Sequence, residues 1–315
     1  MNDLGPLGII LASASLGAIV LEILAYRFIL KRPYVWRSAL ATFVVSVGRQ
    51  ITKVVPIAIT LPGAQWLYEH RLFDASAHGV WSWVALFFGI EFFYYWYHRL
   101  GHRLRWFWLS HAVHHSTNEI NFVAAGRLAW TSQITGAYVI FTPLALLGFK
   151  PETILAGYAL NLTYQFWIHA DWAPKLGWLE GILNTPSAHR VHHAANLEYL
   201  DANYGGVLVI FDRLFGTYIP ERDDLPCRYG LVHPLTTNNP LKIVFHQFGP
   251  FLRDVASARS FREVWGYFFA PPGWRPDGNS ETTEDMRRKA AAEKRTVAPV
   301  LPAHETGREA AAVQA

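Results

Sequence analysis

Long apolar segments are the feature that most constrains the fold of this chain. Five of them approach the roughly 20 residues that an α-helix needs to cross a bilayer. They are residues 7–30, 39–61, 80–97, 134–147 and 153–168. The last two are short and are joined by the polar connection GFKPE, so we expect a helical hairpin that either spans the membrane or re-enters it. The sequence therefore predicts an all-α integral membrane protein with about four or five transmembrane or re-entrant helices.

The composition agrees with a membrane protein. Hydrophobic residues make up 51% of the chain and charged residues only 17%, whereas an average soluble domain has about 25% charged residues. The net charge of +4 is spread over loops and the C-terminal segment, which favours the rim of a membrane protein over a nucleic-acid surface. The single cysteine, Cys227, excludes a disulfide framework within the chain and is typical of a reducing compartment.

The positions of lysine and arginine predict the orientation in the membrane. The loop after the first apolar segment contains Lys31, Arg32 and Arg37, whereas the preceding MNDLG contains no basic residue. Because basic residues concentrate in cytoplasmic loops, we expect the N-terminus outside and this loop inside. Alternation then places the regions after the third and fifth segments in the cytoplasm. We therefore expect a multi-pass protein with a cytoplasmic helical cap.

Histidines are concentrated between residues 98 and 193, which contain nine of the fourteen. They are His98 and His102, the triplet His111, His114 and His115, the single His169, and the triplet His189, His192 and His193. The pair and the two triplets have helical spacing, which places the side chains of each set on one face. A lone histidine in such a chain is usually a hydrogen-bonded structural residue. Eight in three same-face sets would repel one another when protonated and lose hydration when neutral. A shared metal centre resolves both problems.

The number of imidazoles indicates the kind of metal centre. A structural zinc ion needs four ligands and a catalytic one needs three, so eight or nine imidazoles suit two ions with open positions. Soluble di-iron bundles use glutamates as well, but the triplets contain no carboxylate, and the HExxH zinc motif is absent. A histidine-rich pair of iron ions that activates O₂ fits best. A zinc-dependent membrane hydrolase and a non-catalytic metal carrier or sensor stay open as alternatives.

The resemblance to a known family rests on four segments: EFFYYWYHRLGH, FWLSHAVHHS, FWIHAD and NTPSAHRVHHAANLEYLDANYGGVLVIFDRLFGTY. Together they resemble the fatty acid hydroxylase and sterol desaturase superfamily, in the branch of alkylglycerol monooxygenases and bacterial relatives, over about residues 80–275. The resemblance implies a non-haem di-iron oxygenase that hydroxylates, or less readily desaturates, a C–H bond of a lipid with O₂ and two external electrons. By motif position, it implies that the eight histidines of the pair and the triplets are ligands. It also makes His169 a further ligand or a partner that orients one.

The same resemblance implies the cofactors and partners. We expect two iron ions, a membrane lipid as substrate, and a separate electron donor, which is a tetrahydropterin or a ferredoxin-type or cytochrome-type protein. We expect no nucleic acid partner and, as location, a bacterial inner membrane with the metal site facing the cytoplasm. The sequence leaves open the lipid, the carbon that is oxidised and the oligomeric state.

Several other polar residues are candidates for a place near the metals. Glu91 lies seven residues before His98 and so on the same helix face. Since a carboxylate within the membrane is costly and usually functional, it either supports an imidazole or pairs with an arginine. The turn LDANYGG follows the last triplet, and the resemblance adds Asp201, Asn203 and Tyr204 from it as near-site residues. Asn118 is a weaker candidate of the same kind.

Three units are expected along the chain. Residues 1–79 form N-terminal membrane helices, residues 80–275 form the hydroxylase-like catalytic domain, and residues 276–315 form a mostly disordered tail with one short helix around residues 284–294. Within the first unit, Glu22, Arg49 and Lys53 interrupt the apolar helices. They are expected to pair with one another or to extend toward the headgroups.

Overall fold

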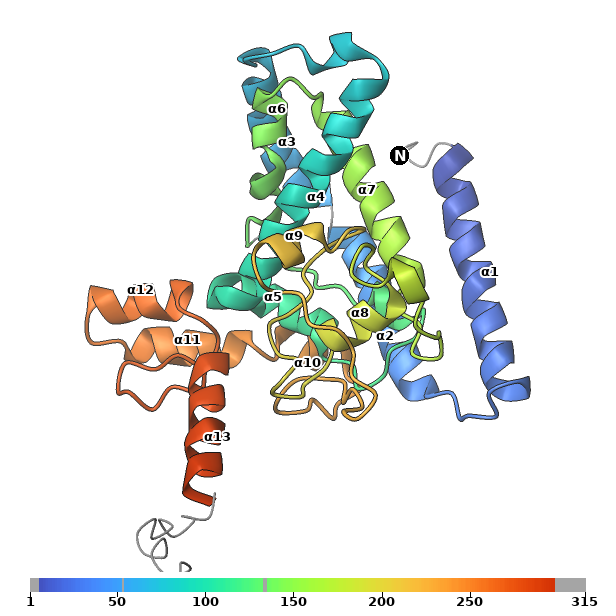
Figure 1. Ribbon diagram of the computed structural model, residues 1–315. Helices are drawn as coiled ribbons and strands as arrows, with labels where there is room; N and C mark the ends of the chain where they lie inside the picture. Colours follow the sequence, from blue (N-terminus) through green and yellow to red (C-terminus); the bar gives the residue numbers. More distant parts are fainter. Residues whose placement is uncertain (1–5, 53, 133–134, 298–315) are drawn as a thin grey trace, which may run out of the picture.

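The computed structural model describes residues 6–52, 54–132 and 135–297, and these residues form helices and loops with three isolated β-bridges and no β-strand (Figure 1). The all-α prediction is therefore confirmed. The α-helices are α1 (Pro6–Phe28), α2 (Trp36–Thr52), α3 (Val54–Glu69), α4 (Val80–Arg103), α5 (Arg105–His115), α6 (Pro143–Leu146), α7 (Pro151–Trp167), α8 (Pro186–His192), α9 (Ile210–Leu214), α10 (Pro240–Phe245), α11 (Phe248–Ser257), α12 (Phe261–Phe269) and α13 (Thr283–Val297). Short 3₁₀ helices are η1 (Ala75–His78), η2 (Ala124–Gly126), η3 (Ala137–Phe141) and η4 (Gly177–Leu179).

The apolar segments form helices of unequal length. Among the described residues, one helix, over Gly8–Phe28, is long and apolar enough to cross a membrane by length and composition alone. The second segment is divided between α2 and α3, the third lies within α4, and the fifth is α7. The expected hairpin of two helices is wrong for its first member, because the described part of residues 134–147 contains only η3 and the single turn of α6. Gly136 with a φ of 83° precedes η3, and Pro143 begins α6, so neither piece extends into a longer helix.

Helix α4 is the centre of the fold. It packs on α5, α7 and η3, and its buried side chains Leu86, Ile90 and Tyr94 meet Leu144 and Tyr158 in the largest apolar core. A second core joins α2, α5 and α10, and a third lies under α8 and the loop that follows it. Each of the helices α4, α5 and α8, which carry most of the clustered histidines, therefore packs in one of the three cores.

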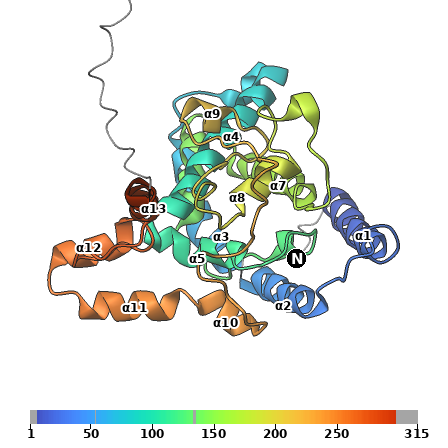
Figure 2. The same ribbon diagram turned by 60° about the horizontal axis from the view of Figure 1, so that its bottom comes forward.

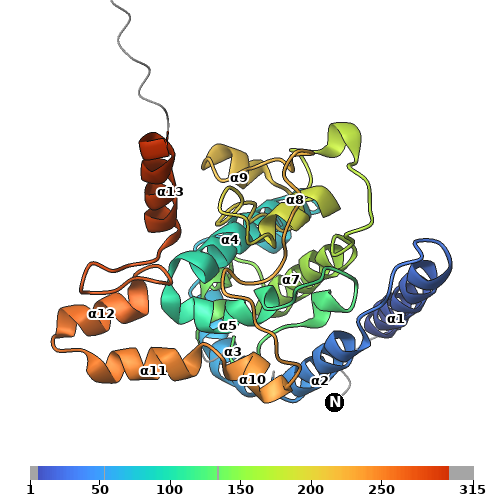
Figure 3. The same cartoon turned by 90° about the horizontal axis from the view of Figure 1, so that it is seen from below.

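The elements at the two ends of the chain flank the central helices. Figures 2 and 3 place α1 on one side of α4, α5 and α8, and α11, α12 and α13 on the other side. The short helix expected around residues 284–294 is present as α13. Its Arg287 donates hydrogen bonds to the carbonyls of Leu197 and Leu200, and its Glu284 pairs with Arg103. This helix is therefore held against the body of the protein, and residues 298–315 of the expected tail lie outside the described residues.

Candidate metal centre

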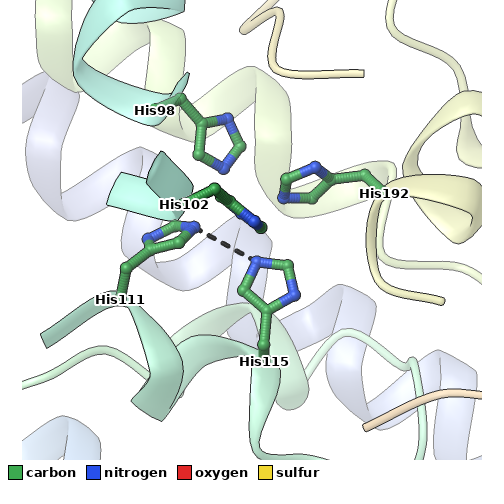
Figure 4. Close-up of side chains that lie close together, drawn as sticks. All are labelled: His98, His102, His111, His115 and His192. Carbon is green, nitrogen blue, oxygen red and sulfur yellow. Dashed lines mark hydrogen bonds between the residues drawn. The ribbon is translucent and has the colours of Figure 1, made fainter. Parts of the chain in front are cut away.

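All nine histidines between residues 98 and 193 converge, although they come from four separate parts of the chain. Their ligand-capable nitrogens form two groups, and within each group these atoms all lie within 4.8 Å of one another. The first group is His98, His102, His111, His115 and His192, and the second is His114, His169, His189 and His193. Figure 4 shows the five side chains of the first group pointing toward a common centre. Each triplet therefore contributes to both groups.

Local backbone features bring the helices of the two motifs together. Leu104 has extended backbone angles, ends α4 and begins α5, so the histidine faces of these two helices meet at a bend. At α8, the hydroxyl of Thr185 accepts a hydrogen bond from the amide of Ala188 at 3.1 Å, and Pro186 occupies the first turn. Both are favoured residues at a helix start. The cap begins a helix of seven residues that contains His189 and His192, and His193 follows directly as its C-cap residue.

Backbone and carboxylate oxygens orient three imidazoles of the first group. The Nδ1 atoms of His98 and His192 lie 2.9 Å from the carbonyl oxygens of Tyr204 and Ala202. The Nδ1 of His102 lies 3.4 Å from a carboxylate oxygen of Asp201. Because these oxygens can only accept, each Nδ1 carries the proton and each Nε2 keeps a lone pair. These three Nε2 atoms are buried and have no hydrogen-bond partner in the described part of the chain.

The second group is more tightly clustered through its Nε2 atoms. His169 Nδ1 lies 2.7 Å from the carbonyl oxygen of Gln165, which leaves the lone pair on Nε2. That Nε2 is 3.3 Å from the Nε2 of His114 and 3.0 Å from the Nε2 of His189. The Nε2 of His193 is in turn 3.1 Å from that of His189. His169 therefore lies within the group and not behind it.

These distances fit the demands of a bound metal ion. With metal–nitrogen bonds of about 2.1 Å, neighbouring ligand nitrogens are roughly 3.0 to 3.4 Å apart in octahedral or tetrahedral geometry. The separations in the second group fall in this range, as does the 3.1 Å between the Nε2 atoms of His111 and His115. Burial, followed by the neighbouring imidazoles, lowers the pKa of His115 and His193 well below the usual value, and burial lowers the pKa of His169 to about 4. Neutral imidazoles with buried lone pairs are the form that binds transition metals.

The predicted near-site residues of the LDANYGG turn lie beside the first group. Asp201 contacts His102 and also accepts a hydrogen bond from Arg103 at 3.1 Å. Tyr204 acts through its carbonyl oxygen, as described above. The side chain of Asn203 binds the backbone at Ala188 and Ile219, so it shapes the turn and does not orient an imidazole. Asp201 and Asn203 have φ values of 56° and 57°, a left-handed conformation that these residue types tolerate better than most.

Glu91 and Asn118 have other partners than the expected ones. One carboxylate oxygen of Glu91 accepts from the Asn161 amide at 2.5 Å, and the other accepts from the backbone amides of Val207 and Leu208 at 2.9 and 2.7 Å. Glu91 therefore anchors the loop after Tyr204 and supports no imidazole directly. The exposed Asn118 donates to the carbonyl of Leu235.

Replacing Glu91 by alanine is expected to destabilise the protein by about 3 kcal/mol, because the buried amide of Asn161 and the half-buried backbone amides of Val207 and Leu208 lose their acceptor. Glutamine at the same position keeps one acceptor oxygen and should cost less. Thermal unfolding of the purified protein in detergent measures both. An alanine variant as stable as the unmodified protein would contradict the anchoring role of Glu91.

Asp212 is a functional neighbour that the sequence reasoning missed. Its carboxylate accepts from the backbone amides of Tyr204 and Gly205 at 2.7 and 2.8 Å and from the hydroxyl of Thr217 at 2.7 Å. It therefore positions the carbonyl that orients His98. The sequence signal that could have indicated it is an acidic residue within the apolar run VLVIFDRLFG. The structure buries this residue completely.

Glu22 also differs from the expectation. Its two carboxylate oxygens accept from the Trp172 indole at 3.0 Å and from the Phe122 amide at 2.8 Å, two partners that the sequence did not suggest. Lys53 lies outside the described residues. These bonds tie α1 to the loops around the second histidine group.

An apolar cavity of about 610 Å³ adjoins the histidines. Its walls come from α1, α2, α4, α5, α7 and the loop around η2, and His111, His114 and His169 lie in its lining. Most of the other lining side chains are aliphatic or aromatic. Such a cavity suits the hydrocarbon chain of a lipid.

Comparison with known proteins defines the class to which this fold and site belong. Residues 83–217 match the fatty acid hydroxylase family model, and this range contains all nine histidines. This part of the chain is therefore similar to the fatty acid hydroxylase family, as the motif resemblance predicts. No solved structure matches the chain significantly.

The relatives within this class are lipid hydroxylases and monooxygenases. The chain is 39% identical to the alkylglycerol monooxygenase of Homo sapiens over 221 residues, which are 70% of this chain and 48% of that protein. It is 39% identical to the alkylglycerol monooxygenase of Danio rerio over 196 residues, or 62% and 43% of the two chains. It is 34% identical to the ornithine lipid hydroxylase OlsE of Rhizobium tropici over 128 residues, or 41% and 39%. The chain thus spans about half the length, or less, of these relatives.

Proposed function

We propose that this protein is a membrane-bound non-haem di-iron oxygenase that hydroxylates a C–H bond of a lipid. One observation carries the proposal: eight buried histidines and the half-buried His111 form two metal-sized groups directly beside an apolar cavity. The overall reaction consumes O₂, two electrons and two protons, and it yields the hydroxylated lipid and one water. Desaturation would need the same ingredients, and the names of the relatives favour hydroxylation.

The two histidine groups would each hold one ion. The five histidines of the first group and the four of the second, His169 included, supply only neutral nitrogen ligands. Two iron ions held there would supply the redox chemistry with O₂. The protein positions the lipid in the apolar cavity and keeps bulk water away from the reacting carbon. Fixed oxygens hold the Nδ1 protons of His98, His102, His169 and His192, so that the Nε2 atoms of these residues are free for the metal.

The membrane location is part of the proposal. We infer that α1, α2 with α3, α4 and α7 lie in the bilayer and that the histidine-bearing ends face the cytoplasm. Large apolar side chains on these helices are exposed, among them Leu21 at 68%, Phe43 at 63% and Trp81 at 71%. A surface of this kind suits contact with lipid. It also lets a membrane lipid reach the cavity between α1 and α2 without crossing water.

The carboxylate beside His102 offers a test of the orienting contacts. Replacing Asp201 by asparagine is expected to weaken metal binding by about 10- to 100-fold, because the amide is a poorer acceptor for Nδ1–H and no longer favours the ligand tautomer. The fold should persist. Titration of the metal-free protein with iron measures the affinity, and Asp223→Asn at an exposed carboxylate is the matched control. Equal affinities would rule out the orienting role.

The decisive experiment combines metal analysis with a lipid assay on protein purified in detergent. We expect about two iron ions per chain and an oxidation of lipid that depends on O₂ and on added reductant. Alkylglycerols and ornithine lipids are the first substrates to test, with a tetrahydropterin and a ferredoxin or cytochrome as donors. Zinc alone with hydrolysis of lipid would support a hydrolase. Bound metal without any turnover of lipid would support a carrier or sensor.

A further inference from the structure

A second cavity touches the first histidine group. It has a volume of about 260 Å³, and His102, His115 and His192 lie in its lining. The apolar cavity, in contrast, reaches His111, His114 and His169, and the described residues that line one cavity do not line the other. The histidines therefore form a partition between two separate spaces.

The second cavity differs from the apolar one in its chemistry. Its lining includes Asp201, Gln247, Glu281 and Thr283, and the indole of Trp108 lies 5.3 Å from the ring of His102, centroid to centroid. A neighbouring cavity of about 370 Å³ shares several of these walls and is lined by Arg105, Arg253 and Arg275 as well. Apolar side chains such as Leu200, Val232 and Met286 line the second cavity as well, so it is mixed in character but more polar than the first. Its polar and charged groups can hold water, which suits a dissolved molecule.

Elements from the C-terminal part of the chain form the outer wall of this cavity. Thr283 and Met286 of α13 line it. The helix is held there by the ion pair between Arg103 and Glu284 and by the hydrogen bonds of Arg287. The second cavity thus lies against α13, and Figures 1 and 3 place α13, with α11 and α12, on the side opposite to α1.

We propose that the second cavity is the binding site of a small, water-soluble electron donor, which reaches the metal centre from the side opposite to the lipid. The inference rests on the proposed function, because hydroxylation needs two electrons that the chain itself does not supply. The donor gives up two electrons, while two protons and one oxygen atom of O₂ leave as water and the other oxygen atom enters the C–H bond. Because His102, His115 and His192 line the site, the donor contacts imidazoles that would hold the metal. The lipid binds in the other cavity and does not compete with the donor for space.

Thiol accessibility tests the two spaces without any metal. Cys227 is the only cysteine, so Cys227→Ser provides a background in which single cysteines are introduced. We expect Met286→Cys to react with a small charged methanethiosulfonate. We expect Ala129→Cys, which lines the apolar cavity, to resist that reagent and to react with a lipophilic maleimide. Equal labelling of both positions by the charged reagent, or no labelling of position 286, would overturn the separation.

The same cysteine tests the function of the second cavity. After folding and iron loading, labelling at position 286 should slow the reduction of iron by ascorbate by about tenfold or more, a barrier increase of about 1.4 kcal/mol. The absorption of the oxidised iron centre follows the reaction. Lys289→Cys, on an exposed position of the same helix, is the control and should leave the rate unchanged after labelling.

These measurements distinguish a failure of the donor site from a failure of the proposed function. Equal reduction rates in protein labelled at 286 and at 289 would overturn the donor site, whatever the lipid assay shows. Protein that binds no redox-active metal would overturn the proposed function, and the thiol labelling would still report whether two separate spaces exist. Lipid binding should be unaffected by the label at 286, since the label lies outside the apolar cavity.

Discussion

Replacing His114 by alanine is expected to remove iron from the second histidine group and to abolish lipid oxidation. The imidazole is buried, its Nε2 is 3.3 Å from that of His169, and three other imidazoles cannot replace the missing ligand. Loss of a residue that only orients a metal ligand lowers metal affinity or activity by about 10- to 100-fold. Loss of the ligand itself should therefore lower activity by at least about 100-fold. Metal analysis should show about one iron ion fewer per chain. Both measurements use the same purified sample.

His246 provides a matched control for this substitution. It is a partly buried histidine outside both groups, and its Nδ1 lies 2.8 Å from the carbonyl oxygen of Ile243. His246→Ala should keep the iron content and most of the activity, even if the protein becomes less stable. Full oxidation of lipid by His114→Ala would remove this residue from the ligand set. An equal loss in both variants would indicate a general effect of packing.

Filling the apolar cavity is expected to block the lipid while leaving the metals in place. Ala125→Trp adds an indole to the wall of the space of about 610 Å³. If the indole displaces two or three methylene groups of the bound chain, the lost burial is about 2 kcal/mol, which corresponds to a roughly 30-fold weaker interaction with the lipid. The weaker binding should appear as a higher KM for the lipid. Iron content and the rate of reduction by ascorbate should stay as in the unmodified protein.

The control for cavity filling is the same change on an exposed surface. Ala256 lies on α11 and is exposed, away from the apolar cavity. Ala256→Trp should leave KM unchanged. If Ala125→Trp oxidises lipid with unchanged KM, the substrate does not occupy this cavity. A loss of iron in Ala125→Trp would mean that the indole disturbs the histidines, and a smaller side chain such as valine would then separate the two effects.

The helix spacing of the histidines was readable from the sequence because it is a local property. Residues three and four apart on a helix share a face, so His111, His114 and His115 had to point to one side of α5. The same local logic anticipated α4, α7 and the short helix α13. It failed for residues 134–147, where hydrophobicity suggested a helix but Gly136 and Pro143 favoured short turns.

The division of the histidines into two groups was not readable from the sequence. The first triplet sends His111 and His115 to one group and His114 to the other, and the second triplet is divided in the same way. Neighbours on one helix face cannot reveal this division, since it depends on the bend at Leu104 and on where the tertiary fold places α8. The roles of Glu91 and Asp212 likewise depend on contacts with residues far along the chain.

The sequence by itself determined that this chain is helical and apolar and that it presents its histidines in sets on single helix faces, because composition and spacing act within a few residues. Only the tertiary structure decided that the nine histidines form two groups, that the LDANYGG turn supplies the oxygens that orient three of them, and that an apolar cavity and a more polar one meet at them. The physical reason is that these features are contacts between segments far apart in the chain, such as Leu16 and His169 in the apolar cavity. Such contacts are set by the packing of α4, α5, α7 and α8 as a whole, and no local pattern encodes them.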